Sequence, residues 1–153
     1  MISVNDLIAP VNPLIMALLR SPIHRFASGA LLVVSWSGRS SGRRYSIPVG
    51  YQRDGDDIVV MLTKPGEKSW WKNFRMPWPA ELLVQGRERT AMGEWVEPGS
   101  EEFFRLVEKT LRGTAWMAGQ LGLTDYDPAR GLTKGQRTIA CEKAGAVRFE
   151  LTD

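Results

Sequence analysis

Histidine and cysteine are almost absent from this sequence, which contains one of each, His24 and Cys141. A single cysteine excludes an intrachain disulfide and a cysteine zinc cluster. Pairs spaced for metal binding are missing as well, so no metal site is predicted. No Ser-His-Asp or Cys-His arrangement can be built around His24, and Cys141 is expected in a strand as a small core residue. No catalytic side chain is therefore predicted, and any catalysis is expected to come from a bound cofactor.

Long apolar runs and a large excess of charge are also lacking. No run approaches the length that crosses a bilayer. Four residues interrupt the start of the chain, unlike the core of a secretory signal, so a cytoplasmic location is expected: Asn5, Asp6, Pro10 and Pro13. A net charge of +3, from 20 basic and 17 acidic residues, is too small to demand nucleic acid, and no nucleic-acid partner is expected.

The basic residues that matter lie in two loops. Residues 39–44 contain three arginines and no acid, whereas residues 64–75 contain four cations and only Glu67. Two local basic loops in a nearly neutral protein favour a small anionic ligand over a long polyanion. The alternative interpretation is a solvated hairpin turn and a tryptophan pair with a charged rim.

The length of 153 residues predicts one domain, residues 1–153, of ordinary globular composition. Residues 1–29 repeat apolar side chains every three or four positions and contain two helix starts, Asn12-Pro13 and Ser21-Pro22. Packing of these helices on a sheet is the favoured interpretation. Peripheral contact with a membrane, or contact with an apolar substrate, is the alternative.

The rest of the chain alternates short strands with tight turns. Strands are expected at residues 31–37, 45–52, 58–63, 81–85, 89–96, 137–142 and 147–151, with hairpin turns at residues 53–56 and 86–87. Pro48 cannot donate to a ladder, so its strand is expected at an edge or a bulge. Helices are expected at residues 70–74, from a Ser100 cap to residue 112, and at residues 115–121. This order predicts an α+β fold whose antiparallel sheet curls into a small barrel.

Both loops suit an anion. The glycines at positions 38 and 42 allow close backbone approach, so amides can converge on an oxyanion, and the neighbouring arginines add bidentate donors. In the second loop Ser69 is expected to cap the helical turn that starts at Trp70, whose amides also favour an anion.

In combination, these segments resemble the deazaflavin (F420)-dependent nitroreductase family. The resemblance rests on Gly38-Arg39-Ser40-Ser41-Gly42, then Arg44 and Pro48, then a strand ending at Lys64, then Trp71-Lys72-Asn73-Phe74, and it covers roughly residues 12–96. It implies a split β-barrel of about six antiparallel strands with flanking helices. It also implies hydride transfer from reduced coenzyme F420 to an apolar, electron-poor acceptor such as a nitroaromatic, a quinone or an enone.

The resemblance also implies which residues bind the cofactor. These are Arg39, Ser40, Ser41 and Arg44 at the phosphate and acidic tail, Pro48 and Val49 at the ring, Thr63 and Lys64 near phosphate or ring, Trp70 and Trp71 as a wall, and Asn73 at the turn. The sequence departs from the family at Ser40, where a lysine is usual, and at Gly50, where known members carry a tyrosine. The acceptor pocket is expected between the N-terminal helices and Trp116.

Three alternatives stay open at this point. The cofactor of the barrel could be FMN or haem instead of F420. The protein could also be a non-enzymatic carrier of a cofactor or lipid, or a weak binder of single-stranded nucleic acid through its basic loops and tryptophans. A monomer and a homodimer fit the sequence equally well.

Overall fold

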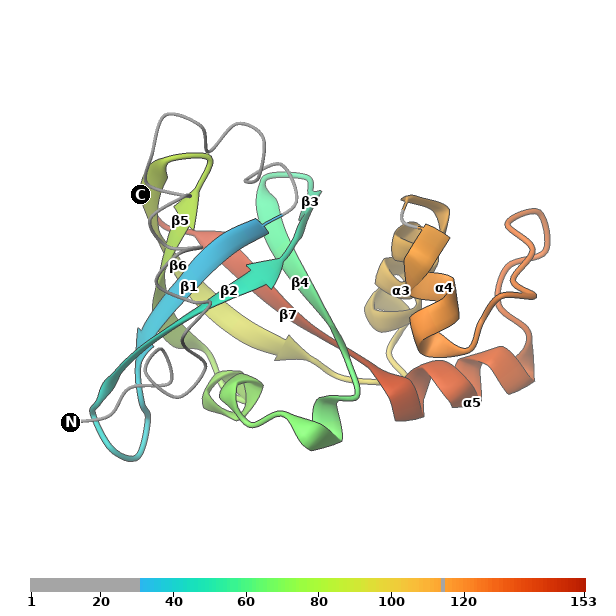
Figure 1. Cartoon of the computed structure of the whole chain (residues 1–153), viewed down its shortest axis with the longest axis horizontal. Helices are drawn as coiled ribbons and strands as arrows, with labels where there is room; N and C mark the ends of the chain where they lie inside the picture. Colours follow the sequence, from blue (N-terminus) through green and yellow to red (C-terminus); the bar gives the residue numbers. More distant parts are fainter. Residues whose placement is uncertain (1–30, 114) are drawn as a thin grey trace.

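One antiparallel sheet organises the molecule. The computed structural model describes residues 31–113 and 115–153; the predicted N-terminal helices lie outside these residues. The seven strands are β1 (Leu31–Ser37), β2 (Arg44–Gly50), β3 (Gln52–Asp54), β4 (Asp57–Thr63), β5 (Trp78–Val84), β6 (Arg87–Val96) and β7 (Ala144–Leu151). They pair antiparallel in the order β2-β1-β5-β6-β7-β4-β3. The sheet curls into a half-barrel (Figure 1), which confirms the predicted α+β split barrel.

The helical elements fall into two groups. Two short 3₁₀ helices, η2 (Pro65–Glu67) and η3 (Trp70–Phe74), connect β4 to β5. Three α-helices lie between β6 and β7: α3 (Glu101–Gly113), α4 (Ala115–Leu121) and α5 (Lys134–Lys143). Figure 1 shows the three α-helices gathered at one side of the sheet, with α5 leading directly into β7. No helix in the described part of the chain is long and apolar enough to cross a membrane.

Two apolar cores result from this arrangement. One lies inside the curled sheet and contains Trp36, Phe74 and Phe149. The other lies between the sheet and the α-helices and contains Val59, Phe103 and Leu106. Strand β4 contributes to both, because its alternate side chains point to opposite faces of the sheet.

The caps and edges follow local sequence chemistry. Helix α3 begins as predicted, with the Phe103 amide donating to Ser100 Oγ at 3.1 Å. The hairpin predicted at residues 53–56 forms between β3 and β4, with Asp54 opposite Asp57 and Gly55 at a φ of 62°. Pro48 lies in β2, an edge strand of the sheet, as the missing donor requires.

Residues 137–142 are helical, so the strand predicted there is wrong and Cys141 lies half-buried in α5. A capping box starts this helix: the Gln136 amide donates to Thr133 Oγ1 at 3.1 Å, and the Thr133 amide donates to Gln136 Oε1 at 2.9 Å. The β-branched pair Thr138 and Ile139 favours a strand locally. The two backbone N–H groups that the capping box satisfies, together with the packing of α5 against the other helices, outweigh that preference.

Two smaller predictions are also wrong. The second hairpin turns at Gln85 and Gly86, whose φ values are 49° and 78°, and Arg87 already pairs with Val84. Two consecutive left-handed residues make the turn that suits a two-residue hairpin. The Ser69 side chain makes no cap hydrogen bond, because η3 is a single 3₁₀ segment and Ser69 lies outside the extended region that N-caps usually adopt.

Candidate functional site

A large hollow of about 1150 Å³ lies between the β1–β2 hairpin and the segment that holds η3. Its wall has four kinds of side chain: the aromatics Trp36, Tyr45 and Trp70; the cations Arg39, Lys68, Lys72 and Arg75; the small polar residues Ser40, Ser41, Ser69 and Asn73; and the apolar Ile47, Pro48, Val49 and Met76. Gly38 and Glu67 complete it. The size and mixed lining match a site for a small organic ligand.

Aromatic rings form one side of this hollow. Trp36 and Tyr45 face each other across β1 and β2, and their rings stack with centroids 5.6 Å apart. The Trp70 ring lies 6.0 Å from Trp36 at a tilt of 43°. Phe74 meets Trp36 edge-on and is fully buried, so it supports this group from the core side. These rings offer a planar ligand an apolar contact surface.

Cations from the segment between β4 and β5 also line the hollow. Lys72 and Arg75 flank Trp71, with their charged atoms 6.0 and 5.2 Å from its ring centroid. The third cation, Lys68, donates to the backbone oxygen of Thr63. Among residues 31–113 and 115–153, no ion pair joins these three cations to a carboxylate. The hollow therefore presents positive charge to an anionic group.

Arg39 is already occupied within the protein. Its guanidinium donates to the carbonyl oxygens of Asn73 at 3.1 Å, Met76 at 3.0 Å and Pro77 at 3.1 Å. It also lies 4.2 Å over the ring of Trp78. The Arg39 amide donates to Asn73 Oδ1 at 2.9 Å, and the Asn73 amide group donates to the Trp70 carbonyl. Arg39 and Asn73 thus fasten the 38–43 loop to η3.

Three of the six amides of that loop are bonded within it. Gly38 donates to the Arg43 carbonyl at 2.7 Å, Gly42 donates to the Gly38 carbonyl at 2.8 Å, and Arg43 donates to Ser41 Oγ at 3.2 Å. With the Arg39 amide bonded to Asn73, four of the six loop amides already have acceptors, and Ser40 and Ser41 line the hollow.

Seven of the eleven predicted binding residues line this one hollow: Arg39, Ser40, Ser41, Pro48, Val49, Trp70 and Asn73. The other four lie elsewhere. Arg44 pairs with Glu81 of β5 at 2.5 Å, and Thr63 pairs with Ala144 of β7. Lys64 has a left-handed backbone and its amide donates to the Lys143 carbonyl. Trp71 stacks on Trp95 at 4.1 Å and donates to the Pro65 carbonyl.

Trp36, Tyr45 and Ile47 line the hollow but were not predicted from the sequence. A usable signal was present, because Tyr45, Ile47 and Val49 alternate along one strand and share a face. The side chain of Trp116 lies outside the described part of the chain. Its helix α4 packs in the helical core through Met117 and Leu121, and the residues described as lining the hollow come from other segments.

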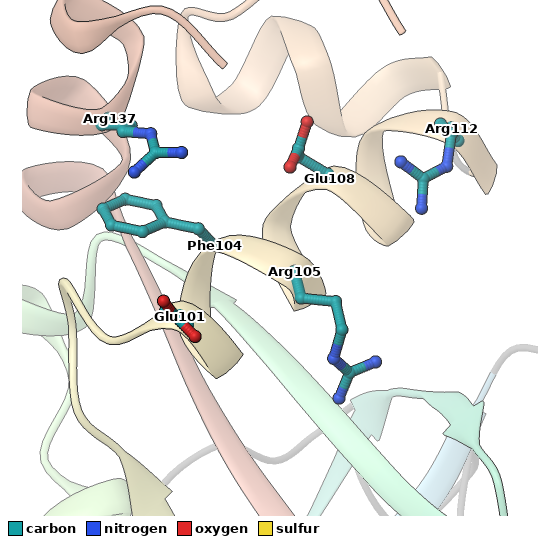
Figure 2. A pocket seen from close by; sticks show the side chains of 6 residues that line it. All are labelled: Glu101, Phe104, Arg105, Glu108, Arg112 and Arg137. Atoms are coloured by element: carbon teal, nitrogen blue, oxygen red, sulfur yellow. The ribbon is translucent and has the colours of Figure 1, made fainter. Parts of the chain in front are cut away.

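A second, smaller hollow of about 290 Å³ lies on the helical group (Figure 2). Figure 2 shows Arg137 of α5 above the ring of Phe104 of α3, at 4.7 Å. Arg105 makes two hydrogen bonds to Asp54, and Tyr126 connects Arg112 with Glu108. These interactions involve four of the five charged residues around the smaller hollow, which we interpret as a solvated helix face.

Replacing Arg39 with Lys is expected to lower the free energy of unfolding by about 2 kcal/mol, because an ammonium group cannot reach three carbonyls and stack on Trp78 at once. Urea unfolding measures this loss. The matched control is Arg43→Lys in the same exposed loop, which should unfold like the wild type. Equal stability of the two variants would show that Arg39 does not fasten the loop.

Comparisons with known proteins identify the fold. No protein-family model and no curated protein matches the sequence. Among solved structures, the chain is similar to an F420-H2-dependent reductase, FDR-A, with a TM-score of 0.55 and 13% identity over 79% of this chain and 94% of that one. It is also similar to a domain-swapped dimer, with a TM-score of 0.55 and 11% identity over 93% and 100% of the two chains.

A third similar structure is a candidate pyridoxamine 5′-phosphate oxidase from Listeria innocua, with a TM-score of 0.51 and 10% identity over 92% of this chain and 93% of that one. The name of the first neighbour agrees with the family that the sequence motif resembles. At identities of 10 to 13%, these similarities are evidence for the fold. The chain therefore has the split β-barrel fold that these proteins share.

Proposed function

We propose that this protein is an oxidoreductase that binds a deazaflavin, coenzyme F420, in the hollow between β2 and η3 and uses it to reduce an apolar, electron-poor acceptor. The observation that carries the proposal is the combination, in one hollow, of an aromatic wall and cations that pair with no carboxylate of the described residues. The fold shared with an F420-H2-dependent reductase supports it.

The residues present fit such a cofactor. F420 combines a planar conjugated ring with a phosphate and an acidic tail, and the hollow offers a surface for each part. Trp36, Tyr45 and Trp70 would pack beside the ring, with Pro48 and Val49 on the β2 side. Lys68, Lys72 and Arg75, with the hydroxyl of Ser40, would hold the phosphate and the tail.

The chemistry of the bound deazaflavin is hydride transfer. The residues of the chain contribute binding, orientation and the exclusion of water by the aromatic wall. Arg39 and Asn73 join the 38–43 loop to η3, so the two sides of the hollow keep their relative positions. The positive charge of Lys72 and Arg75 also favours negative charge on any group bound near them.

The four predicted residues outside the hollow receive a supporting role in this proposal. Trp71 orders the segment that carries Lys72 and Arg75 by stacking on Trp95, and Arg44 ties β2 to β5 through Glu81. Thr63 and Lys64 fix the point where β4 leaves the sheet.

We also propose that the chain forms a single domain and assembles as a homodimer. The similar domain-swapped dimer motivates the second point.

Titration of the purified protein with F420 tests the proposal, with the fluorescence of the coenzyme as the readout and FMN in parallel. We expect saturable binding that weakens as the salt concentration rises, because exposed charges are screened. The double variant Lys72→Ala/Arg75→Ala should bind F420 roughly 30- to 800-fold more weakly, since each of the two charged contacts contributes about 1–2 kcal/mol.

The matched control is Arg87→Ala, which removes an exposed cation at the β5–β6 turn and should leave the affinity unchanged. No binding of F420 at low salt would refute the proposal. Binding of FMN but not of F420, with a yellow colour of the purified protein, would instead indicate that the hollow binds an ordinary flavin.

A further inference from the structure

Two hydroxyl groups in the wall of the hollow are bonded to each other. Tyr45 Oη and Ser41 Oγ lie 3.3 Å apart, and both side chains line the hollow. The Arg43 amide donates to Ser41 Oγ at 3.2 Å. The pair holds two hydroxyl protons and uses one of them for its mutual bond, whichever oxygen donates. Among residues 31–113 and 115–153, no atom accepts the second proton, so it is left for a bound ligand.

The pair is accessible, and the protein supports it on both sides. Ser41 is exposed and Tyr45 is half-buried, so a ligand in the hollow can reach their oxygens. The Tyr45 ring stacks on the fully buried ring of Trp36, with centroids 5.6 Å apart. Ser41 belongs to the 38–43 loop, which Arg39 joins to η3. The donor is therefore in place before a ligand binds, which lowers the entropic cost of the contact.

Gly38 makes room for this pair. A Cβ atom at position 38 would come within 2.6 Å of Ser41 Oγ and 2.9 Å of Tyr45 Cε2. Gly38 is buried and its φ lies outside the left-handed region, so its backbone conformation does not require a glycine. The absence of a side chain is needed because the two hydroxyl-bearing side chains pack directly on this residue.

The charged donors of the hollow come from another segment. Its three cations without an ion-pair partner among the described residues lie between β4 and β5. On the hairpin side, Arg39 is bonded to three carbonyls and Arg44 pairs with Glu81. Anionic groups form their strongest hydrogen bonds with charged donors. The phosphate and acidic tail of the cofactor are thus matched by the cations, and the neutral hydroxyl pair is left for a neutral oxygen.

Apolar side chains adjoin the pair along β2. Tyr45, Ile47 and Val49 share one face of this strand, and all three line the hollow. A ligand that lies along the strand meets an apolar surface with a hydroxyl donor at one end. Such a surface suits an apolar conjugated molecule that carries an oxygen at its edge.

We infer that the Tyr45–Ser41 pair donates a hydrogen bond to a neutral oxygen of the electron-poor acceptor, and that it selects acceptors with a conjugated carbonyl or nitro oxygen. This inference rests on the proposed function, because it assigns the cations to the cofactor. The hydroxyl donor also favours the negative charge that develops on this oxygen as the acceptor is reduced. Ser41 then contacts the acceptor, whereas the sequence resemblance implied a place at the phosphate.

A matched pair of ligands tests the contact. 2-Acetylnaphthalene and 2-isopropenylnaphthalene have nearly the same shape, and the carbonyl oxygen of the first is a methylene group in the second. The wild-type protein, saturated with oxidised F420, should bind the ketone about five- to tenfold more tightly than the alkene, the contribution of one hydrogen bond. The double variant Ser41→Ala/Tyr45→Phe keeps the aromatic stack and should bind the two ligands equally.

The matched control is Ser35→Ala/Ser46→Ala. Ser35 and Ser46 form another hydroxyl pair of the same hairpin, with their oxygens 2.7 Å apart, and neither residue lines the hollow. This variant should retain the wild-type preference for the ketone.

A second measurement needs no variant. Wild-type protein labelled with ¹³C at tyrosine Cζ gives three signals, from Tyr45, Tyr51 and Tyr126. The Tyr45 signal should lie further downfield in the ketone complex than in the alkene complex, because both ligands pack alike and only the ketone accepts a hydrogen bond from the pair. This holds for either direction of the Tyr45–Ser41 bond, since hydrogen bonds in a chain strengthen one another. Tyr126, whose hydroxyl donates to Glu108, is the internal reference.

The outcomes separate this inference from the proposed function. A preference for the ketone that disappears in Ser41→Ala/Tyr45→Phe, together with the downfield Tyr45 signal, supports the inference. Binding of F420 with equal affinities of the wild type for ketone and alkene would overturn it and leave the proposed function intact. A double variant that binds F420 more weakly but still prefers the ketone would also overturn it and assign the pair to the cofactor. Failure of the wild type to bind F420 would remove both.

Discussion

Replacing Asp54 with Asn is expected to lower the free energy of unfolding at pH 7 by about 3 kcal/mol, one of the two largest effects that we predict. Asp54 ends β3, and only 13% of its side chain is exposed. Arg105 donates to both of its carboxylate oxygens at 2.9 and 2.8 Å, Lys109 donates at 3.1 Å and Arg148 donates at 2.6 Å. The asparagine keeps the shape but leaves these three cations without their common anion.

The position of Asp54 explains why the effect should be large. Arg148 of β7 also donates to Asp57 at 2.8 Å and to Glu102 at 2.9 Å, so the charges join the β3–β4 hairpin, β7 and helix α3. This network fastens the helical group to the sheet seen in Figure 1. Removing one partner of such a network costs more than an isolated surface pair contributes.

The Asp54 carboxylate should also make the stability of the protein depend on pH. Hydrogen bonds from Arg105, and then from Arg148, hold the pKa of Asp54 well below its usual range. The stability that this provides is fully present above the pKa of an unfolded aspartate, about 3.9, and is lost as the pH falls toward the lower pKa of the folded state. The difference between wild type and Asp54→Asn should therefore shrink by roughly 1 kcal/mol for each pH unit below about 4.

Urea unfolding from pH 7 to pH 3 measures both effects. The matched control is Asp56→Asn, which changes an exposed aspartate in the same hairpin and should follow the wild type at every pH. A stability difference between wild type and Asp54→Asn that persists unchanged down to pH 3 would show that the charge of Asp54 is not its source.

Replacing Gly93 with Ala should destabilise the protein by about 3 kcal/mol. Gly93 lies in β6, and a Cβ atom at this position would come within 2.6 Å of Phe74 Cδ1 and 2.7 Å of Phe149 Cε1. Both rings are fully buried and meet edge-on with centroids 5.3 Å apart, so neither can move without disturbing the core. The glycine is required because the Phe74 ring packs directly on the sheet.

This substitution should also weaken ligand binding, because Phe74 anchors η3, which carries Trp70, Lys72 and Asn73 of the hollow. Unfolding in urea and the F420 titration measure the two effects on one sample. Gly66→Ala is the matched control: nothing lies within 4 Å of the added carbon, and stability and binding should be unchanged. A Gly93→Ala protein as stable as this control would contradict the packing argument.

The sequence by itself determined the local elements. Alternating apolar residues bounded by turn signals predicted six of the seven strands at or near their observed places, and Ser100 predicted the start of α3. The curled antiparallel sheet followed from the short connections between them. These features depend on neighbours within a few residues, so the sequence contains the information directly.

The wrong strand prediction arose where local strand preference competed with helix capping. Residues 137–142 contain β-branched side chains but form α5, since the Thr133–Gln136 capping box satisfies the first donors of a helix. The signal was in the sequence, in the four residues directly before the run. The capping signal prevailed over the strand preference because α5 packs with α3 and α4 in the helical core.

The tertiary structure alone decided the composition of the candidate site. The sequence showed two basic loops but not that Arg39 would be bonded to three carbonyls. The strand order β2-β1-β5-β6-β7-β4-β3 brings β2 and η3 together from distant parts of the chain. Whether a donor is free for a ligand depends on partners more than 30 residues away, and such pairings are set by packing rather than by local sequence.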